Sequence, residues 1–143
     1  MISFFTQDIT FKLKNKHRHR LWLKELLVKN GKKRCSLNII FCSNSYILEV
    51  NRQFLWHNYC TDVISFDYNE PTLANKINGD IFIGIETVRA NAIKFGASTF
   101  EEEILRVMAH GLFHLIGYND VTVDERLVMT QMENDAIKLY MSL

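Results

Sequence analysis

The sequence has few of the residues that mark extracellular or membrane proteins. Of its 143 residues only three are cysteine, and Cys35, Cys42 and Cys60 show no C-x-x-C spacing. An odd number of cysteines in this arrangement indicates neither a disulfide framework nor a thiolate zinc site, so we interpret all three as small buried hydrophobic residues. No apolar run approaches the roughly 20 residues of a membrane span, and no signal peptide is recognisable at the N-terminus. These absences favour a cytoplasmic protein that makes no membrane contact.

Linker-like sequence is also absent. The only proline, Pro71, lies in a stretch that we interpret as a loop, and there is no repeat, low-complexity tract or glycine- and serine-rich connection. The composition, 48% hydrophobic and 23% charged, is that of an ordinary globular chain. We therefore expect residues 1–143 to form a single domain, whose core needs neither disulfides nor metal for its stability.

Acidic and basic residues are unevenly distributed, although the formal net charge is only +1. Residues 12–34 contain ten lysines and arginines and a single acid, Glu25, whereas acids dominate from Glu101 onward. The basic stretch can bind a polyanion, or it can be the solvated face of a helix. The sequence leaves both interpretations open.

The spacing of apolar residues predicts alternating strands and helices. Asn44 or Ser45 can cap the second helix, and Ser98 or Thr99 can open the fourth. We predict an α+β fold in which one small mixed β-sheet is covered by helices. Strands are expected at residues 2–5, 36–42, 62–68 and 79–85, and helices at 17–30, 44–55, 86–95, 99–116 and 124–141.

The segment 106–120, RVMAHGLFHLIGYND, places two histidines in an apolar run. At a spacing of four residues, His110 and His114 share one face of a helix about 6 Å apart. Gly117 can end that helix and let the chain fold back, so that Asp120 reaches the same point. Two imidazoles and a carboxylate with a free fourth position are typical of catalytic zinc. We predict a metal site on this C-terminal helix and the following turn, the alternative being two neutral core histidines bonded to backbone carbonyls.

The residue after the first histidine separates two known kinds of zinc site. Long-motif zinc proteases place a glutamate there as proton acceptor, a role that Gly111 cannot fill. The segment HGLFHLIGYND instead resembles the H-G-x-L-H-L-x-G-Y-D-H signature of the YbeY family. Residues 61–66, TDVISF, are similar to the family's P-T-D/N-V-L-S-F, and residues 79–81 to its G-D-I/L. With a later helix that carries Met129 and Met132, the resemblance covers roughly residues 48 to 135.

The resemblance implies a zinc-dependent endoribonuclease that is specific for single strands. It would act in the maturation of the small-subunit rRNA 3′ end and in ribosome quality control. One Zn²⁺ would be held by His110, His114 and Asp120. The implied partners are rRNA, ribosomal particles and ribosome-assembly proteins.

Three positions depart from the family pattern. Asp120 stands where the third ligand is usually histidine, and Asn119 where the pattern has aspartate. The carboxylate removes one unit of positive charge from the metal centre. Leu55 occupies the position of an arginine that the family often carries and that is linked to the RNA backbone, and the nearby Arg52 cannot be equated with it.

No general base is evident from the sequence, but acids at the ends of the predicted strands are candidates. Asp80 and Asp62 can border the cleft, as can Ser65, although turns and caps also use such residues. The helices around the motif carry three cations that can meet phosphates or lie solvated: Arg89, Lys94 and Arg106.

Two functions from other classes remain as alternatives. A zinc metallopeptidase is suggested by the paired histidines and disfavoured by Gly111. A non-catalytic ribosome-binding module with a structural metal would bind rRNA without cutting it. If Asp120 is not the third ligand, His57, the nearest preceding histidine, is the first candidate to replace it.

Overall fold

A computed structural model describes residues 1–57, 61–96 and 98–143. The prediction of a buried thiol at Cys60 therefore lies outside the described residues. Within the described part, the strands are β1 (Ile2–Gln7), β2 (Arg34–Cys42), β3 (Val63–Asp67) and β4 (Lys76–Gly84). The helices are α1 (Lys16–Lys29), α2 (Asn44–Leu55), α3 (Ile85–Phe95), α4 (Phe100–Ile116) and α5 (Val123–Ser142).

The strands form one mixed sheet in the order β1-β2-β4-β3. β2 pairs in parallel with both β1 and β4, while the edge strand β3 runs antiparallel to β4. Parallel neighbours need a crossover connection, and α1 supplies the one between β1 and β2. The predicted small mixed sheet covered by helices is confirmed.

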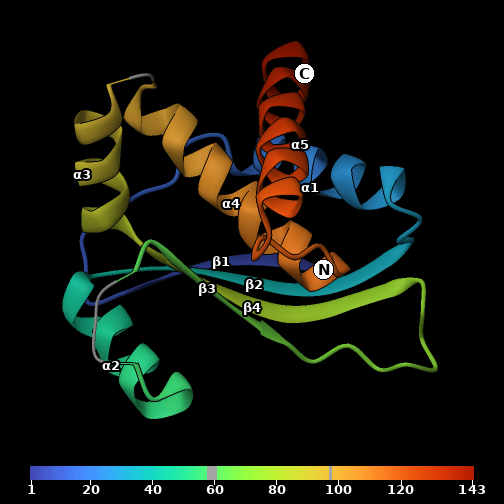
Figure 1. Ribbon diagram of the computed structural model, residues 1–143, viewed down its shortest axis with the longest axis horizontal. Helices are drawn as coiled ribbons and strands as arrows, with labels where there is room; N and C mark the ends of the chain where they lie inside the picture. The colour runs from blue at the N-terminus through green and yellow to red at the C-terminus, as the bar shows by residue number, and fades with distance from the viewer. Residues whose placement is uncertain (58–60, 97) are drawn as a thin grey trace.

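The helices cover the two faces of the sheet unequally. In Figure 1, α1, α4 and α5 lie on one face with α3 beside α4, and α2 lies on the other face. Successive side chains of a strand point to opposite faces. In β4, Ile81 and Ile83 therefore enter the core with Leu112 of α4, whereas Phe82 packs in the smaller cluster around Ile47 of α2.

Two glycines allow α4 to lie close to the sheet. A Cβ atom at Gly111 would come within 2.8 Å of Ile81 Cγ2, and one at Gly79 within 2.9 Å of Leu115 Cδ1. Real Cβ atoms do not approach other atoms so closely, so any larger residue would push the helix outward. The hydroxyl of Ser65 on β3 also donates to the Gly111 carbonyl oxygen at 3.0 Å. The sheet thereby fixes the helix turn that follows His110.

α1 is anchored to its neighbours by side chains that bond to backbone carbonyls. Trp22 Nε1 donates to the Ala136 carbonyl oxygen at 2.7 Å, and Arg18 Nη2 donates to the Tyr140 carbonyl oxygen at 2.6 Å. Arg20 Nε donates to the carbonyl oxygen of Ile2 at 3.0 Å. Two cations of the basic stretch thus hold α1 against α5 and β1.

Several element boundaries differ from the sequence prediction by one to three residues, and two of the differences have a direct structural reason. Ser43, rather than Asn44 or Ser45, caps α2, because its extended backbone lets Oγ accept from the Tyr46 N–H at 3.1 Å. β4 begins at Lys76, three residues before the predicted start, because its first residues pair with the start of β2. Thr99 is the cap of α4, one of the two residues predicted for this role.

None of the helices in the described part of the chain combines the length and the apolar character needed to cross a lipid bilayer.

Candidate metal centre

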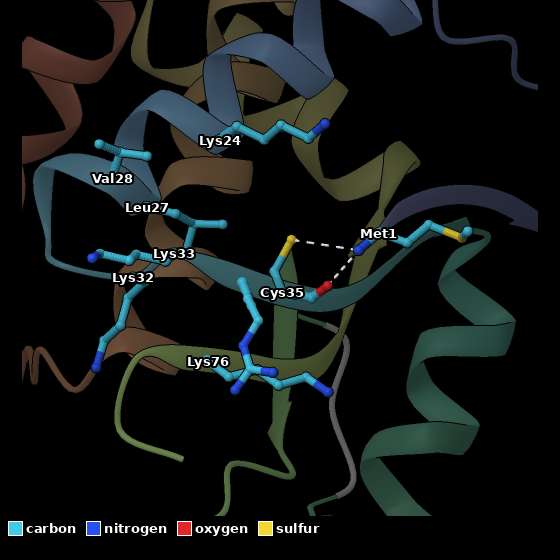
Figure 2. Close-up of a pocket in the computed structure, with 9 residues that line it drawn as sticks. Met1, Lys24, Leu27, Val28, Lys32, Lys33, Cys35 and Lys76 are labelled. Carbon is cyan, nitrogen blue, oxygen red and sulfur yellow. Dashed lines mark hydrogen bonds between the residues drawn. The ribbon is translucent and has the colours of Figure 1, made fainter.

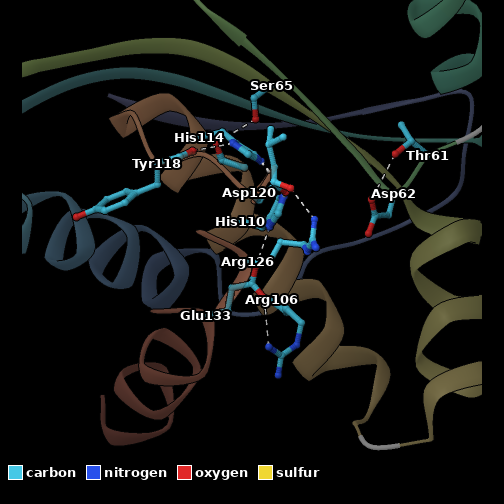
Figure 3. Close-up of polar contacts among 12 residues, drawn as sticks. Thr61, Asp62, Ser65, Arg106, His110, His114, Tyr118, Asp120, Arg126 and Glu133 are labelled. Carbon is cyan, nitrogen blue, oxygen red and sulfur yellow. Dashed lines mark hydrogen bonds and ion pairs between the residues drawn. The ribbon is translucent and has the colours of Figure 1, made fainter. Parts of the chain in front are cut away.

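The two motif histidines and the turn acid meet at the C-terminal half of α4 (Figure 3). His110 Nε2 and His114 Nε2 are 2.9 Å apart, and Asp120 Oδ2 lies 3.2 Å from the first and 3.4 Å from the second. Gly117 ends the helix with a φ of 122°, which favours glycine and turns the chain toward Asp120. These three residues form a group that can hold a metal ion.

The other ring nitrogens fix the orientation of both imidazoles. His110 Nδ1 lies 2.7 Å from Glu133 Oε2, and His114 Nδ1 lies 2.9 Å from the Tyr118 carbonyl oxygen. A carboxylate and a carbonyl can only accept, so both Nδ1 atoms carry the hydrogen. In the neutral rings both Nε2 atoms then present lone pairs toward each other and toward the carboxylate. Such an arrangement repels itself unless a cation or a proton lies between the atoms, so the donor set fits a metal ion.

The pKa of His110 is raised by the acidic residues around it. Burial alone would lower its pKa, but the hydrogen bond to Glu133 and the negative charges of Glu133, Asp120 and Asp62 outweigh burial and raise the pKa. In the metal-free protein a proton therefore competes for this ring, and a bound metal ion must displace it. The surrounding acids favour positive charge at this position in either form.

Glu133 connects the site to the last helix, and the sequence analysis did not find it. It is buried on α5, where Oε2 faces His110 and Oε1 lies 3.3 Å from Arg106 Nη1. The buried positions of α5 also include Met129, Ala136 and Tyr140, so Glu133 is a lone acid on an otherwise apolar helix face. An acid in such a buried stripe is the signal that could have identified it.

The two candidate general bases differ in their relation to His110. Asp62 immediately precedes β3, and its charge raises the pKa of His110. Asp80 shares the face of β4 that α2 covers, and its carboxylate accepts from Asn38 Nδ2 at 3.0 Å and from the Tyr68 hydroxyl at 3.3 Å. Asp62, and not Asp80, is therefore the candidate whose charge acts on a motif histidine.

A cavity of about 260 Å³ lies between the end of α2 and β3. Leu55 and His57 both line it. Among the described residues, the group that can hold a metal ion consists of His110, His114 and Asp120, and His57 is not part of it. Ser65, another candidate of the sequence analysis, lines this cavity and contacts α4 through its bond to Gly111. The lining residues are Asn51, Leu55, His57, Thr61, Val63, Ile64 and Ser65.

The flanking cations of the sequence analysis lie in three different settings. Arg106 is held by Glu133 and, at 3.9 Å, by Glu103, so it supports the site from behind. Arg89 lies over the ring of Phe100. Phe100 precedes His110 by ten residues on α4, so the two positions are roughly 15 Å apart along the helix axis. Lys94 is exposed on α3.

Comparison with known proteins gives a consistent result. The family described as Endoribonuclease YbeY matches residues 2–141. The Endoribonuclease YbeY of Parabacteroides distasonis is 43% identical over 138 residues, which cover 96% of this chain and 94% of that protein. The protein of the same name from Flavobacterium psychrophilum is 41% identical over 140 residues, covering 98% and 96% respectively.

A solved structure is also similar. The solution structure of TM1509 from Thermotoga maritima matches with a TM-score of 0.68 and 26% identity, covering 98% of this chain and 89% of that one. The match over residues 2–141 and the relatives above 40% identity establish what the histidine motif predicted: the chain belongs to the Endoribonuclease YbeY family.

Proposed function

We propose that this protein is a zinc-dependent endoribonuclease that cuts single-stranded RNA, with His110, His114 and Asp120 as the ligands of one Zn²⁺. The observation that carries the proposal is the convergence of three lone-pair donors, two of which are imidazoles whose tautomers are fixed by hydrogen bonds at Nδ1. Membership of a family of endoribonucleases supplies the reaction class. Two imidazoles and one carboxylate are a ligand set that zinc accepts.

The chain's own residues divide the work of the site. When bound, the zinc ion supplies Lewis-acid polarisation of a phosphoryl oxygen and makes a bound water more acidic. Glu133 and the Tyr118 carbonyl hold the two imidazoles in the orientation that presents Nε2. Asp62, whose charge acts on His110, is our candidate to accept the proton of the attacking hydroxyl. These positioned groups provide orientation and proton transfer around the phosphate.

The biological substrate is the finer part of the proposal. We place the activity in the cytoplasm, in maturation of the small-subunit rRNA 3′ end and in ribosome quality control, with ribosomal particles and ribosome-assembly proteins as partners. The support is the similarity of residues 110–120 and 61–66 to the family motifs. Asn119, Asp120 and Leu55 are the departures whose effect the experiments must measure.

The peptidase alternative lacks its proton acceptor. The residue after His110 is a glycine whose Cα lies against the sheet, so no carboxylate stands at this position. A casein-cleavage assay with and without chelator separates this alternative from RNA hydrolysis. The binding-module alternative predicts that rRNA is retained but not cut.

The decisive experiment incubates the protein with folded precursor rRNA of the small subunit, with and without chelator. The parent should cut the RNA, the chelator should stop it and added zinc should restore it. His114→Ala should abolish cleavage and zinc binding together, while His17→Ala, at an exposed histidine of α1, should change neither. Cleavage at the parent rate by nuclease-free His114→Ala protein would contradict the role of the metal.

A further inference from the structure

A second cavity, of about 490 Å³, lies at the end of the sheet where β2 and β4 begin. Figure 2 shows Lys24 on α1 on one side of this cavity and Lys76 on β4 on the other. We call it the basic cavity, because among the described residues that line it five have cationic side chains and none has an acidic one. The five are Lys24, Lys32, Lys33, Arg34 and Lys76.

The cations of the basic cavity lack acidic ion-pair partners in the described part of the chain. In the ranges 1–57, 61–96 and 98–143, no acidic side chain forms an ion pair with any of the five. Arg34 and Lys76 are direct partners across the β2–β4 pairing, so two like charges stand opposite each other. Such a pair destabilises a sheet in the absence of a counter-charge. An anion bound at this position would relieve the repulsion.

Backbone hydrogen bonds hold the loops that carry these cations. The N–H groups of Lys33 and Arg34 both donate to the Asn75 carbonyl oxygen, at 2.9 and 3.2 Å. Lys32 Nζ donates to the Ala74 carbonyl oxygen at 2.7 Å. The α1–β2 turn and the β3–β4 connection, side by side in Figure 1, are thus tied together. These hydrogen bonds therefore fix the backbone positions of the residues that carry the positive charges.

The wall of the basic cavity suits a ligand that has both charged and apolar parts. Val28 is largely exposed and adds an apolar surface to the lining, to which the buried Leu27 contributes little accessible area. An inorganic anion would leave this surface uncovered. A nucleotide strand offers phosphates to the cations and the flat face of a base to the apolar wall.

Tyr118 connects the basic cavity to the metal centre. Its carbonyl oxygen accepts from His114 Nδ1, and its hydroxyl donates at 2.9 Å to Asn30 Oδ1, at the end of α1. Figure 3 shows its side chain pointing away from the histidines and toward α1. α1 also carries Lys24 and Val28 of the cavity wall. One exposed aromatic residue therefore contacts both a motif histidine and the helix that carries part of the cavity wall, and a base can stack on it.

We propose that the basic cavity is a second RNA-binding site, which holds backbone phosphates of the strand that reaches the metal centre past Tyr118. The identity of the ligand as RNA rests on the proposed function. Under this proposal only part of the basic stretch 12–34 binds RNA. Arg18 and Arg20 serve the packing of α1, whereas Lys76, from outside that stretch, joins the binding site.

The test measures RNA binding without cleavage. A fluorescently labelled single-stranded RNA long enough to span both sites is titrated with metal-free protein between about 50 and 200 mM salt. Each phosphate contact with a single strand contributes about 0.7 to the slope of log affinity against log salt. The triple variant Lys33→Glu, Arg34→Glu, Lys76→Glu should lower the magnitude of that slope by ~2 and weaken binding. The neutral triple variant with glutamine at the same positions serves if charge reversal impairs folding, with the same expected loss of slope.

The matched control reverses three exposed lysines of the same basic stretch outside the cavity: Lys12→Glu, Lys14→Glu and Lys16→Glu. Both triple-glutamate variants have the same net charge, so a general electrostatic effect would appear equally in both. The control should keep the parent slope. An equal loss in control and cavity variants, or an unchanged slope in the cavity variants, would overturn the proposal.

A competition experiment separates RNA from an acidic protein as the ligand. Polyglutamate carries the charge but no bases, so it should displace the labelled RNA only weakly. Displacement as effective as by unlabelled RNA at equal charge would show that the cavity binds charge alone, and would overturn the assignment to RNA. Because no cleavage is needed, an inactive metal centre would leave these results unchanged and would count only against the proposed function.

Discussion

His110 on α4 and Glu133 on α5 are joined through Nδ1 and Oε2 at 2.7 Å, although 23 residues separate them in the sequence. The two metal-motif histidines are neighbours on one helix, but the group that orients the first of them comes from another helix. The geometry of the site therefore depends on the packing of α5 against α4. Secondary contacts of this kind are part of how a metal site reaches its affinity.

Replacing Glu133 by glutamine should weaken zinc binding by about 10- to 100-fold, because the amide still accepts from His110 but no longer carries charge. The same change should lower the pKa of His110 in the metal-free protein, since Glu133 is a main cause that raises it. Competition with a chromophoric chelator measures the first effect, and an NMR titration of the imidazole measures the second. The control is Asp135→Asn, an exposed acid two residues along the same helix. Equal zinc affinity in parent and Glu133→Gln would contradict an orienting role.

Asp120 should make the metal site less selective for zinc than a three-histidine site. Carboxylate oxygen also suits manganese and magnesium, whereas imidazole favours zinc. Asp120→His should therefore raise the zinc-to-manganese ratio when both ions are offered in equal amounts, as measured by elemental analysis. Asp120→Ala should lose zinc, and Asp124→Ala, at an exposed acid of α5, should retain it. Full zinc occupancy in Asp120→Ala would assign the third position to another residue, with His57 the first to examine.

Stability should fall on acidification because of His19. The residue is 6% exposed, and burial is the main cause that lowers its pKa; the hydrogen bond to the Asn15 carbonyl opposes this effect, and the charge of Arg18 adds a smaller lowering. The unfolded chain then binds a proton more readily than the folded one. Stability is therefore fully present above the unfolded value of about 6.5 and decreases as the pH falls below it, by up to about 1.4 kcal/mol per pH unit. Urea unfolding at several pH values measures the free energy of unfolding. On acidification it should decrease less in His19→Gln than in the parent, whereas His17→Gln should show the same decrease as the parent. An equal decrease in all three would assign the acid sensitivity to other groups.

Cys42 should be inert toward alkylating reagents while the protein is folded. Burial raises the pKa of its thiol to about 12, so at pH 8 only on the order of 10⁻⁴ of it is thiolate. Cys35 is partly exposed and should react first. Peptide mass spectrometry after iodoacetamide treatment, with and without urea, measures both rates. Alkylation of Cys42 at the rate of Cys35 in the native protein would show that the β2 region opens locally.

The sequence predicted the parts of the site that depend on local geometry. The spacing of His110 and His114 follows from the helical repeat, and Gly117 is the residue that lets the turn bring Asp120 back. The order of strands and helices was also recognisable from the apolar pattern. These features involve residues close together in the chain, where backbone geometry limits the arrangements.

The remaining features depend on contacts between distant segments. Alternation showed that Asp80 and Ile81 face opposite sides of the sheet, but not which side α4 would cover. Arg34 and Lys76 became neighbours only through the parallel pairing of β2 with β4. Strand order and helix placement are set by packing, for which a single sequence contains no local signal.

The close contact between α4 and the sheet also limits which proton acceptors can be placed beside the first motif histidine. Installing the proton-accepting glutamate of zinc proteases at position 111 would direct its side chain toward Ile81 and Val63, where even a Cβ has 2.8 and 3.2 Å. A carboxylate forced between these side chains would be buried, with the Ser65 hydroxyl, 3.1 Å from that Cβ, as its nearest polar neighbour. A designer seeking peptidase chemistry on this scaffold would first have to move α4 away from β4 or rotate it. A single substitution at position 111 is therefore not enough to add the glutamate of a zinc protease, because the backbone of α4 would also have to move.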